Sequence, residues 1–137
     1  MQSSRISLTM QISQNEESFE TSYDTEANFL EKDGKFFLFF DEKNDDGEVT
    51  KCRFEISDIS LRMRRNGPIV IEQIHVKDQM TDGYIKTPFG HVDTKLQTFK
   101  FSFSKQTGRN YYLDLGYNLY TGVEETGTYL LKIKITG

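Results

Sequence analysis

The sequence predicts an all-β protein, a single antiparallel barrel that is closed or nearly closed and has about eight to ten strands. Two observations lead to this prediction. Polar and apolar residues alternate with a period of two along most of the chain, and short turn signals such as Asp-Gly and Asn-Gly separate the alternating runs. No window has the spacing of an amphipathic helix. Antiparallel meanders of this length avoid exposed edges by closing into barrels.

The first expected strands lie in the N-terminal third of the chain. Apolar residues occupy every second position of 6–12, and residues 17–31 alternate in the same way. Asp-Gly at 33–34 then precedes the segment KFFLFFDE at 35–42. Strand, Asp-Gly, strand is the order typical of a β-hairpin.

The remainder of the chain continues the same pattern to its end. Turn signals are followed by further alternating runs, and the turns lie at 44–47, 66–67, 81–83, 106–110 and 121–127. Neither a linker nor an internal repeat interrupts them, so residues 1–137 are expected to form one barrel domain.

The stretch YIKTPFGHVDTKL at 84–96 interrupts the alternation. Proline cannot donate to a strand ladder and glycine permits turn conformations, so Pro88, Phe89 and Gly90 predict a tight corner between two strands. We expect Phe89 to point from this corner into the core. Apolar residues then change parity, and one extra residue near Thr98 would reconcile the two registers, which predicts a β-bulge.

Composition and charge narrow the function classes. A formal net charge of −4 and a pI near 5.2 disfavour general attraction to nucleic acid or anionic lipid. The single cysteine, Cys52, has no partner for an intramolecular disulfide. The N-terminus lacks the apolar core of a signal peptide, and no apolar run is long enough to span a membrane. A cytoplasmic protein is the expectation.

Short motifs spread over most of the chain match a known family. They are Arg65-x-Gly67, Tyr84, TPFG at 87–90, Thr98, LDLGYNL at 113–119 with Tyr117, and YLLKIKI at 129–135. On these motifs the chain resembles the YwiB-like family, small bacterial proteins of unknown function with a calycin-like (lipocalin-like) barrel. The resemblance implies eight to ten strands and carries over no catalytic residue. True lipocalins carry Gly-x-Trp and this chain has no Trp, so fatty-acid or retinoid binding does not follow from the fold.

The sequence has no motif of a known catalytic, nucleotide or metal site, so neither an enzyme nor a cofactor is expected. His91 shares a parity with polar residues and should face solvent, whereas Cys52 shares one with Phe54 and should be a buried, inert thiol. Residues 42–53 begin like a calcium loop. The twelfth position is Arg53 instead of a bidentate glutamate, which favours a solvated hairpin tip without a metal.

Two groups of residues on the outer face suggest an interaction module. Arg62 and Arg64, with Arg65 beside them, form a basic patch that could dock an acidic partner or RNA, or could be a solvated strand face paired with carboxylates. Arg65 is an exception, because it belongs to the Arg-x-Gly motif and could hold the turn through backbone carbonyls or meet a ligand. Phe37 and Phe39 form an outer aromatic pair. Another segment of the chain could cover this pair, or it could mark a homodimer contact.

The inward face suggests the leading hypothesis, non-enzymatic binding of a small, partly apolar ligand inside the barrel. Several tyrosines and threonines share the inward parity, and each buried hydroxyl needs a hydrogen-bond partner. They could satisfy one another and buried water, or they could line a cavity, since small barrels are near the size at which side chains just fill the interior. The expected ligand-contacting residues are Tyr23, Phe54, Met63, Tyr117 and Tyr129.

Overall fold

A computed structural model describes residues 2–137, with side chains from Ser3 onward, and these residues contain ten strands and no helix. Each strand pairs in antiparallel fashion with its neighbours in a closed barrel of order β1-β10-β9-β8-β7-β6-β5-β4-β3-β2. The predicted fold class is confirmed. The strands are β1 (Gln2–Gln14), β2 (Glu17–Lys32), β3 (Lys35–Lys43), β4 (Val49–Ile56), β5 (Ser60–Asn66), β6 (Val70–Val76), β7 (Met80–Thr87), β8 (Gly90–Lys105), β9 (Tyr111–Thr121) and β10 (Glu124–Thr136).

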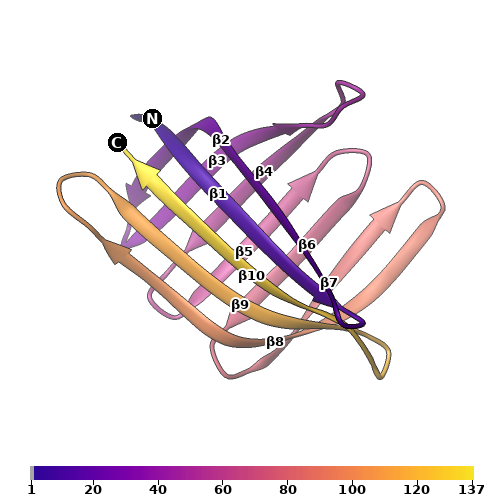
Figure 1. The fold of residues 1–137 in the computed structure, drawn as a ribbon. Coiled ribbons are helices and arrows are strands. Elements are labelled where there is room, and N and C mark those ends of the chain that lie inside the picture. The colour runs from indigo at the N-terminus through magenta and orange to yellow at the C-terminus, as the bar shows by residue number, and fades with distance from the viewer. Residues whose placement is uncertain (1) are drawn as a thin grey trace.

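The first and last strands close the barrel. In Figure 1, β1 and β10 run side by side and the two termini lie near each other. Ile6 is opposite Ile135 and Leu8 is opposite Ile133, and all four side chains are buried. The other neighbours in the barrel are also neighbours in sequence, so this single long-range pairing removes both edges of the meander.

The period of two determines which side chains fill the barrel. Along β3, β4 and β5, every second residue is buried and the residues between them face outward. Leu38, Ile56 and Leu61 are fully buried by this alternation. The same rule places Leu113 and Leu115 of β9 inside. The resulting core is a continuous apolar column enclosed by the barrel wall.

The predicted corner and bulge are both present, but Phe89 was assigned to the wrong environment. β7 ends at Thr87, which pairs with Gly90 at the start of β8, so Pro88 and Phe89 form the turn. Phe89 is 99% exposed, because the turn projects beyond the last ladder pair and no other strand covers it. The bulge lies between Thr98 and Lys100, where the pairing of β8 with β9 shifts by one residue.

The bulge residue and a glycine fit together on the outer face. Phe99 is the extra residue, and its ring lies against Gly116 of β9. A Cβ at Gly116 would be 2.6 Å from the Phe99 ring, so any larger residue there would displace the aromatic side chain. Beyond the bulge, Phe101 and Phe103 pack against the core.

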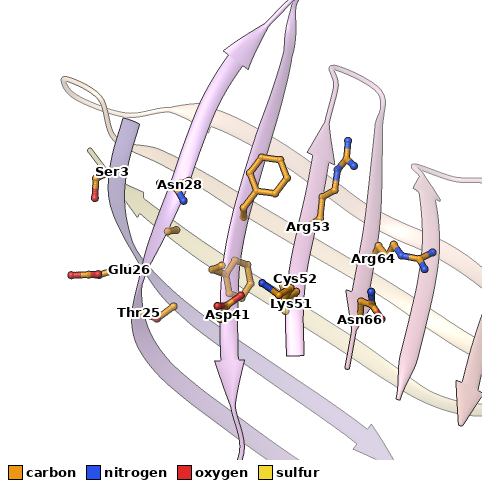
Figure 2. Close-up of a pocket in the computed structure, with 13 residues that line it drawn as sticks. Ser3, Thr25, Glu26, Asn28, Asp41, Lys51, Cys52, Arg53, Arg64 and Asn66 are labelled. Carbon is orange, nitrogen blue, oxygen red and sulfur yellow. The ribbon is translucent and has the colours of Figure 1, made fainter. Parts of the chain in front are cut away.

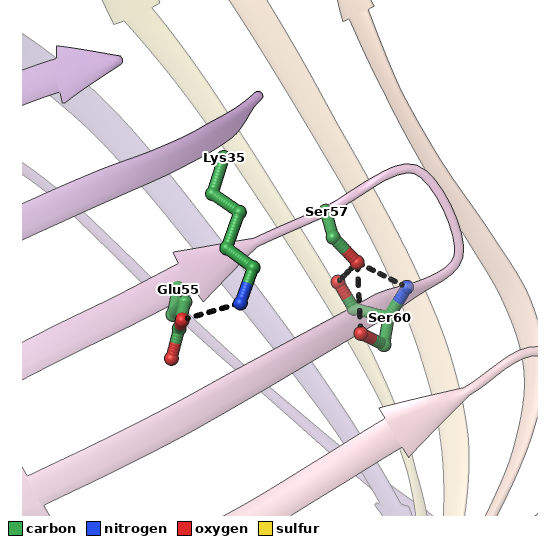
Figure 3. A network of polar contacts seen from close by, with 4 residues as sticks. All are labelled: Lys35, Glu55, Ser57 and Ser60. Carbon is green, nitrogen blue, oxygen red and sulfur yellow. Dashed lines mark hydrogen bonds and ion pairs between the residues drawn. The ribbon is translucent and has the colours of Figure 1, made fainter. Parts of the chain in front are cut away.

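The two ends of the barrel are built differently. The aromatic end contains the β2–β3 and β8–β9 connections, and Phe29, Phe36, Phe103 and Tyr111 cross it with ring centroids 5.0–6.5 Å apart. The β4–β5 turn at this end is held by Ser57 and Ser60, whose side chains and backbone bond to each other (Figure 3). The opposite end, called here the open end, contains the β1–β2, β3–β4, β5–β6, β7–β8 and β9–β10 connections.

Two strands separate near the open end. β2 pairs with β3 only from Asn28 to Lys32, opposite Phe39 to Lys35. Before Asn28, β2 pairs with β1 alone, and after Phe39, β3 pairs with β4 alone. The wall of the barrel therefore divides between β2 and β3 on the way to the open end.

Candidate functional site

A cavity of about 330 Å³ lies inside the half of the barrel toward the open end. Its volume is at the lower limit of small-molecule pockets, which span about 300–1,000 Å³. Strands from all around the barrel contribute to it. The lining residues are Leu8, Met10, Ile12, Thr21, Tyr23, Phe40, Glu42, Cys52, Phe54, Met63, Arg65, Ile71, Gln73, Ile85, Tyr117, Leu119, Tyr129 and Leu131.

The five residues expected from the sequence to contact a ligand all line this cavity. Phe54 of β4 and Met63 of β5 are partners in the strand ladder, and both are almost fully buried. Tyr117 is also buried, and its ring stacks on that of Tyr129 with centroids 5.0 Å apart. Tyr23 of β2 is partly buried. Period-two parity therefore brought together residues from five different strands.

A charged cluster stands at the mouth of the cavity. Arg65 Nη2 lies 2.6 Å from Glu42 Oε1, and the Cys52 thiol donates to the same carboxylate oxygen at 3.1 Å. The side chains of Arg65 and Glu42 are 34% and 26% exposed, whereas Cys52 behind them is buried. Arg65 and Cys52 are directly opposite each other on β5 and β4. The three groups form a compact polar site in an otherwise apolar wall.

Burial keeps the other ionisable groups of this cluster neutral. Burial and the bond to Glu42 raise the pKa of Cys52 to about 12. Burial, followed by the nearby carboxylate of Glu42, also raises the pKa of Tyr23 well above its usual value. The cluster near neutral pH therefore contains one guanidinium, one carboxylate, one thiol and one phenol. Its formal charges cancel.

Two buried polar atoms of the cluster lack a hydrogen-bond partner within the protein. They are the hydroxyl oxygen of Tyr23 and Nε of Arg65. Both residues line the cavity. A buried polar atom without a partner costs about 1–3 kcal/mol, so native proteins supply one from the chain, from water or from a ligand.

A second polar group lies deeper in the barrel and is internally satisfied. Gln73 Oε1 is 2.9 Å from His75 Nε2, and His75 Nδ1 is 3.0 Å from the Thr98 hydroxyl. Burial lowers the pKa of His75 to about 4, so the ring is neutral at pH 7 and its two nitrogens act as one donor and one acceptor. The His75 ring also packs 4.5 Å from that of Tyr117. This chain supports the cavity wall and leaves no open hydrogen-bonding position on the imidazole.

Sequence reasoning grouped Arg65 with the outer patch, while leaving a ligand contact open, and missed several cavity residues. The outer patch was expected to contain Arg65, but the alternation that buries Leu61 and Met63 turns Arg65 inward. Glu42 was placed in a solvated hairpin tip, although it continues the inward parity of Phe40. Gln73 and His75 of β6 are likewise inward. Extending the parity of β3 and β5 toward their ends would have found Glu42 and Arg65. In β6 the apolar Ile74 and Val76 face outward, so alternation alone points away from Gln73 and His75.

The outer face of the neighbouring strands is charged and largely paired. Arg64 bonds to Glu72 at 2.6 Å and to the Tyr84 hydroxyl at 3.2 Å. Lys35 pairs with Glu55 at 3.3 Å, as Figure 3 shows. Arg64 and Lys35 are thus matched by carboxylates, and Arg62 is exposed on the same face, as expected for a solvated strand face.

The outer aromatic pair is covered by an arginine. The Arg53 guanidinium lies over the rings of Phe37 and Phe39, 5.9 and 5.7 Å from their centroids. Both rings are partly buried. Cation–π contacts of this kind shield aromatic surface that would otherwise face water.

A larger cleft, of about 660 Å³, lies where β2 and β3 separate. Figure 2 shows the labelled side chains around it, which stand on β1 to β5. Its outward-facing charges are of both signs, with Glu26 and Asp41 opposite Lys51, Arg53 and Arg64. It is therefore a more polar and more superficial hollow than the cavity inside the barrel.

Comparisons with known proteins found a family model and a similar crystal structure. A family described as "Domain of unknown function (DUF1934)" matches residues 6–133. The structure is similar to a crystal structure of the ywiB protein from Bacillus subtilis, with a TM-score of 0.85, 18% sequence identity, and coverage of 98% of this chain and 91% of that chain. No curated protein matches the sequence. Among residues 2–137, no helix is long and apolar enough to cross a membrane.

Proposed function

Because this chain belongs to the DUF1934 family, whose function is unknown, we propose a function from its cavity: non-enzymatic binding of a small, partly apolar ligand. The ligand occupies the interior of the barrel toward the open end. Phe54 and Met63 form apolar walls, and Tyr23, Tyr117 and Tyr129 supply polar contacts. The confirmed resemblance to YwiB-like proteins adds no activity, since it concerns the fold alone.

One observation carries this proposal. The cavity combines apolar walls with a small polar cluster, in which Arg65 pairs with Glu42 at 2.6 Å and Tyr23 lies beside that carboxylate. Pockets for small molecules have this composition, a mostly apolar lining with a few polar groups that orient the ligand. The aromatic end, by contrast, is filled by its own rings.

The alternative is a protein or nucleic-acid interaction through the outer face. The cleft between β2 and β3 favours it by its size. However, Arg64 is paired with Glu72, and the exposed Arg53 lies over the rings of Phe37 and Phe39. The remaining exposed charges of the cleft are mixed in sign, which suits neither nucleic acid nor a strongly acidic partner.

Native mass spectrometry tests the binding proposal. The protein, as purified and after incubation with a mixture of small amphipathic compounds, is expected to retain a ligand mass. Met63→Trp adds volume inside the cavity and should abolish retention. Arg62→Trp adds the same side chain on the outer face of the same strand and should leave it intact. Thermal unfolding of both variants confirms that they are folded.

Two outcomes would reject the proposal. A wild-type protein that retains no member of the mixture has a cavity that serves packing only. Retention by Met63→Trp but not by Arg62→Trp would place the ligand on the outer face and favour the alternative.

A further inference from the structure

We infer that the cavity selects uncharged amphipathic ligands, such as alcohols and primary amides, over carboxylates of the same chain length. This inference rests on the proposed function and specifies its ligand class. It follows from the charge, the hydrogen-bonding groups and the location of the Glu42–Arg65 cluster.

The charge of the cluster is already balanced. An arginine inside a ligand cavity would ordinarily attract a carboxylate, because the two form charge-assisted hydrogen bonds. Here Glu42 occupies that role, with its Oε1 atom 2.6 Å from Arg65 Nη2. A ligand carboxylate would place a second negative charge beside a single guanidinium, and two carboxylates that share one site repel each other. An uncharged ligand avoids this conflict.

The hydrogen-bonding groups of the cluster suit a neutral oxygen. The Arg65 guanidinium can only donate hydrogen bonds, and the Tyr23 hydroxyl can donate as well as accept. Either group can bond to a hydroxyl or an amide carbonyl. The Cys52 thiol already donates to Glu42, so it does not compete for the ligand. The cluster thus offers donors without offering net positive charge.

The location of the cluster fixes the orientation of the ligand. Glu42 and Arg65 are partly exposed at the mouth, whereas Phe54, Met63 and Leu131 deeper in the cavity are almost fully buried. The polar head therefore stays at the mouth and the apolar part enters first. Moving a carboxylate into this half-buried position also removes part of its hydration, which a hydroxyl loses at lower cost.

The test compares three ten-carbon probes, decanol, decanamide and decanoate, by displacement of a hydrophobic fluorescent dye from the intact protein. At a pH of about 8 the decanoate is ionised. We expect decanol and decanamide to bind at least about tenfold more tightly than decanoate, which corresponds to about 1.4 kcal/mol. Tighter binding of decanoate by the wild-type protein would overturn the inference.

A single substitution should reverse the selectivity. Glu42→Gln leaves Arg65 unpaired and is expected to improve decanoate binding at least about tenfold while changing decanol binding by less than about threefold. The matched control is Asp41→Asn, which removes the same charge from the outer face of the same strand and should leave the ratio unchanged. An unchanged ratio in Glu42→Gln would refute the role of the cluster.

A second variant, which removes the positive charge of the cluster, keeps the inference testable if Glu42→Gln does not fold. Arg65→Gln leaves Glu42 alone at the mouth, so decanoate should bind still more weakly relative to decanol. If no probe binds the wild-type protein, the proposed function itself fails. If all three bind with equal affinity, the cavity binds ligands but does not select by charge, and only this inference fails.

Discussion

The aromatic end and the open end of the barrel use the same alternating strands for different purposes. At the aromatic end, Phe29 and Phe36 stack with centroids 5.7 Å apart, and Tyr111 packs within 5.1–5.2 Å of both. At the open end, the inward positions hold Glu42 and Arg65 around a cavity. At the aromatic end the rings pack on one another across the barrel, whereas at the open end aromatic and polar side chains line the wall and leave room for a small molecule.

The comparison shows how one barrel can be both stable and able to bind. Most of the burial of large apolar side chains is independent of the cavity, so the open end can carry polar groups that a packed core would not accommodate. Substitutions at the two ends should therefore differ in their cost to stability.

The first prediction contrasts a side chain from each end. Phe29→Ala should lower the free energy of unfolding by about 3–5 kcal/mol, because it removes a buried ring that contacts three others. Met10→Ala should cost below about 2 kcal/mol, because Met10 lines an existing cavity and is only partly buried. Urea unfolding measures both. Equal losses would show that the two ends contribute alike.

The second prediction concerns the buried histidine between the two ends. His75 has a pKa of about 4 in the folded protein and about 6.5 when unfolded, so the unfolded chain binds more protons between these values. This contribution to stability is complete above about pH 6.5 and is lost as the pH falls toward about 4, at a cost of about 2–3 kcal/mol.

Substitution isolates that contribution. His75→Gln cannot titrate, so its free energy of unfolding should fall less than that of the wild-type protein between about pH 7 and about pH 4. His91→Gln is the control, because His91 lies on the exposed outer face beside Asp93. A parallel decline in all three proteins, measured by urea unfolding at each pH, would contradict the assignment to His75.

The third and smallest effect compares two adjacent arginines. Both make an ion pair with an N–O distance of 2.6 Å, Arg64 on the outer face and Arg65 in the cavity mouth. Arg64→Met should change the free energy of unfolding by less than about 1 kcal/mol, as is usual for exposed pairs. Arg65→Met should cost about 1–3 kcal/mol, because it leaves Glu42 without its counter-charge beside apolar walls. Similar costs for the two would mean that the mouth is as well solvated as the outside.

Local chemistry explains why so much of the fold could be predicted. Side-chain parity is a property of each strand, so the inward positions of Tyr23, Phe54, Met63, Tyr117 and Tyr129 could be read from alternation alone. The change of parity after Leu96 likewise revealed the bulge. Phe89 was misplaced because a two-residue turn interrupts the alternation and projects away from every other strand.

The polar cluster could not be predicted from the sequence, because its residues lie on strands that are not neighbours in the sheet. Glu42 and Arg65 lie on β3 and β5, which are separated by β4, and only the curvature of the barrel brings their side chains to 2.6 Å. A charged residue at a strand end looks like part of a solvated turn in the sequence. Its inward direction becomes meaningful only when the register of the neighbouring strands is known.

The sequence by itself determined the all-β class, the turns, the bulge and the inward face of most strands, because these depend on neighbours one to four residues apart. The tertiary structure alone decided that β1 pairs with β10, which end is filled by rings, and that a cavity with a charge-balanced mouth remains at the other. Those features depend on contacts between distant segments. Alternation along a strand predicts which side of the sheet a residue faces, but it does not predict which residues it contacts there.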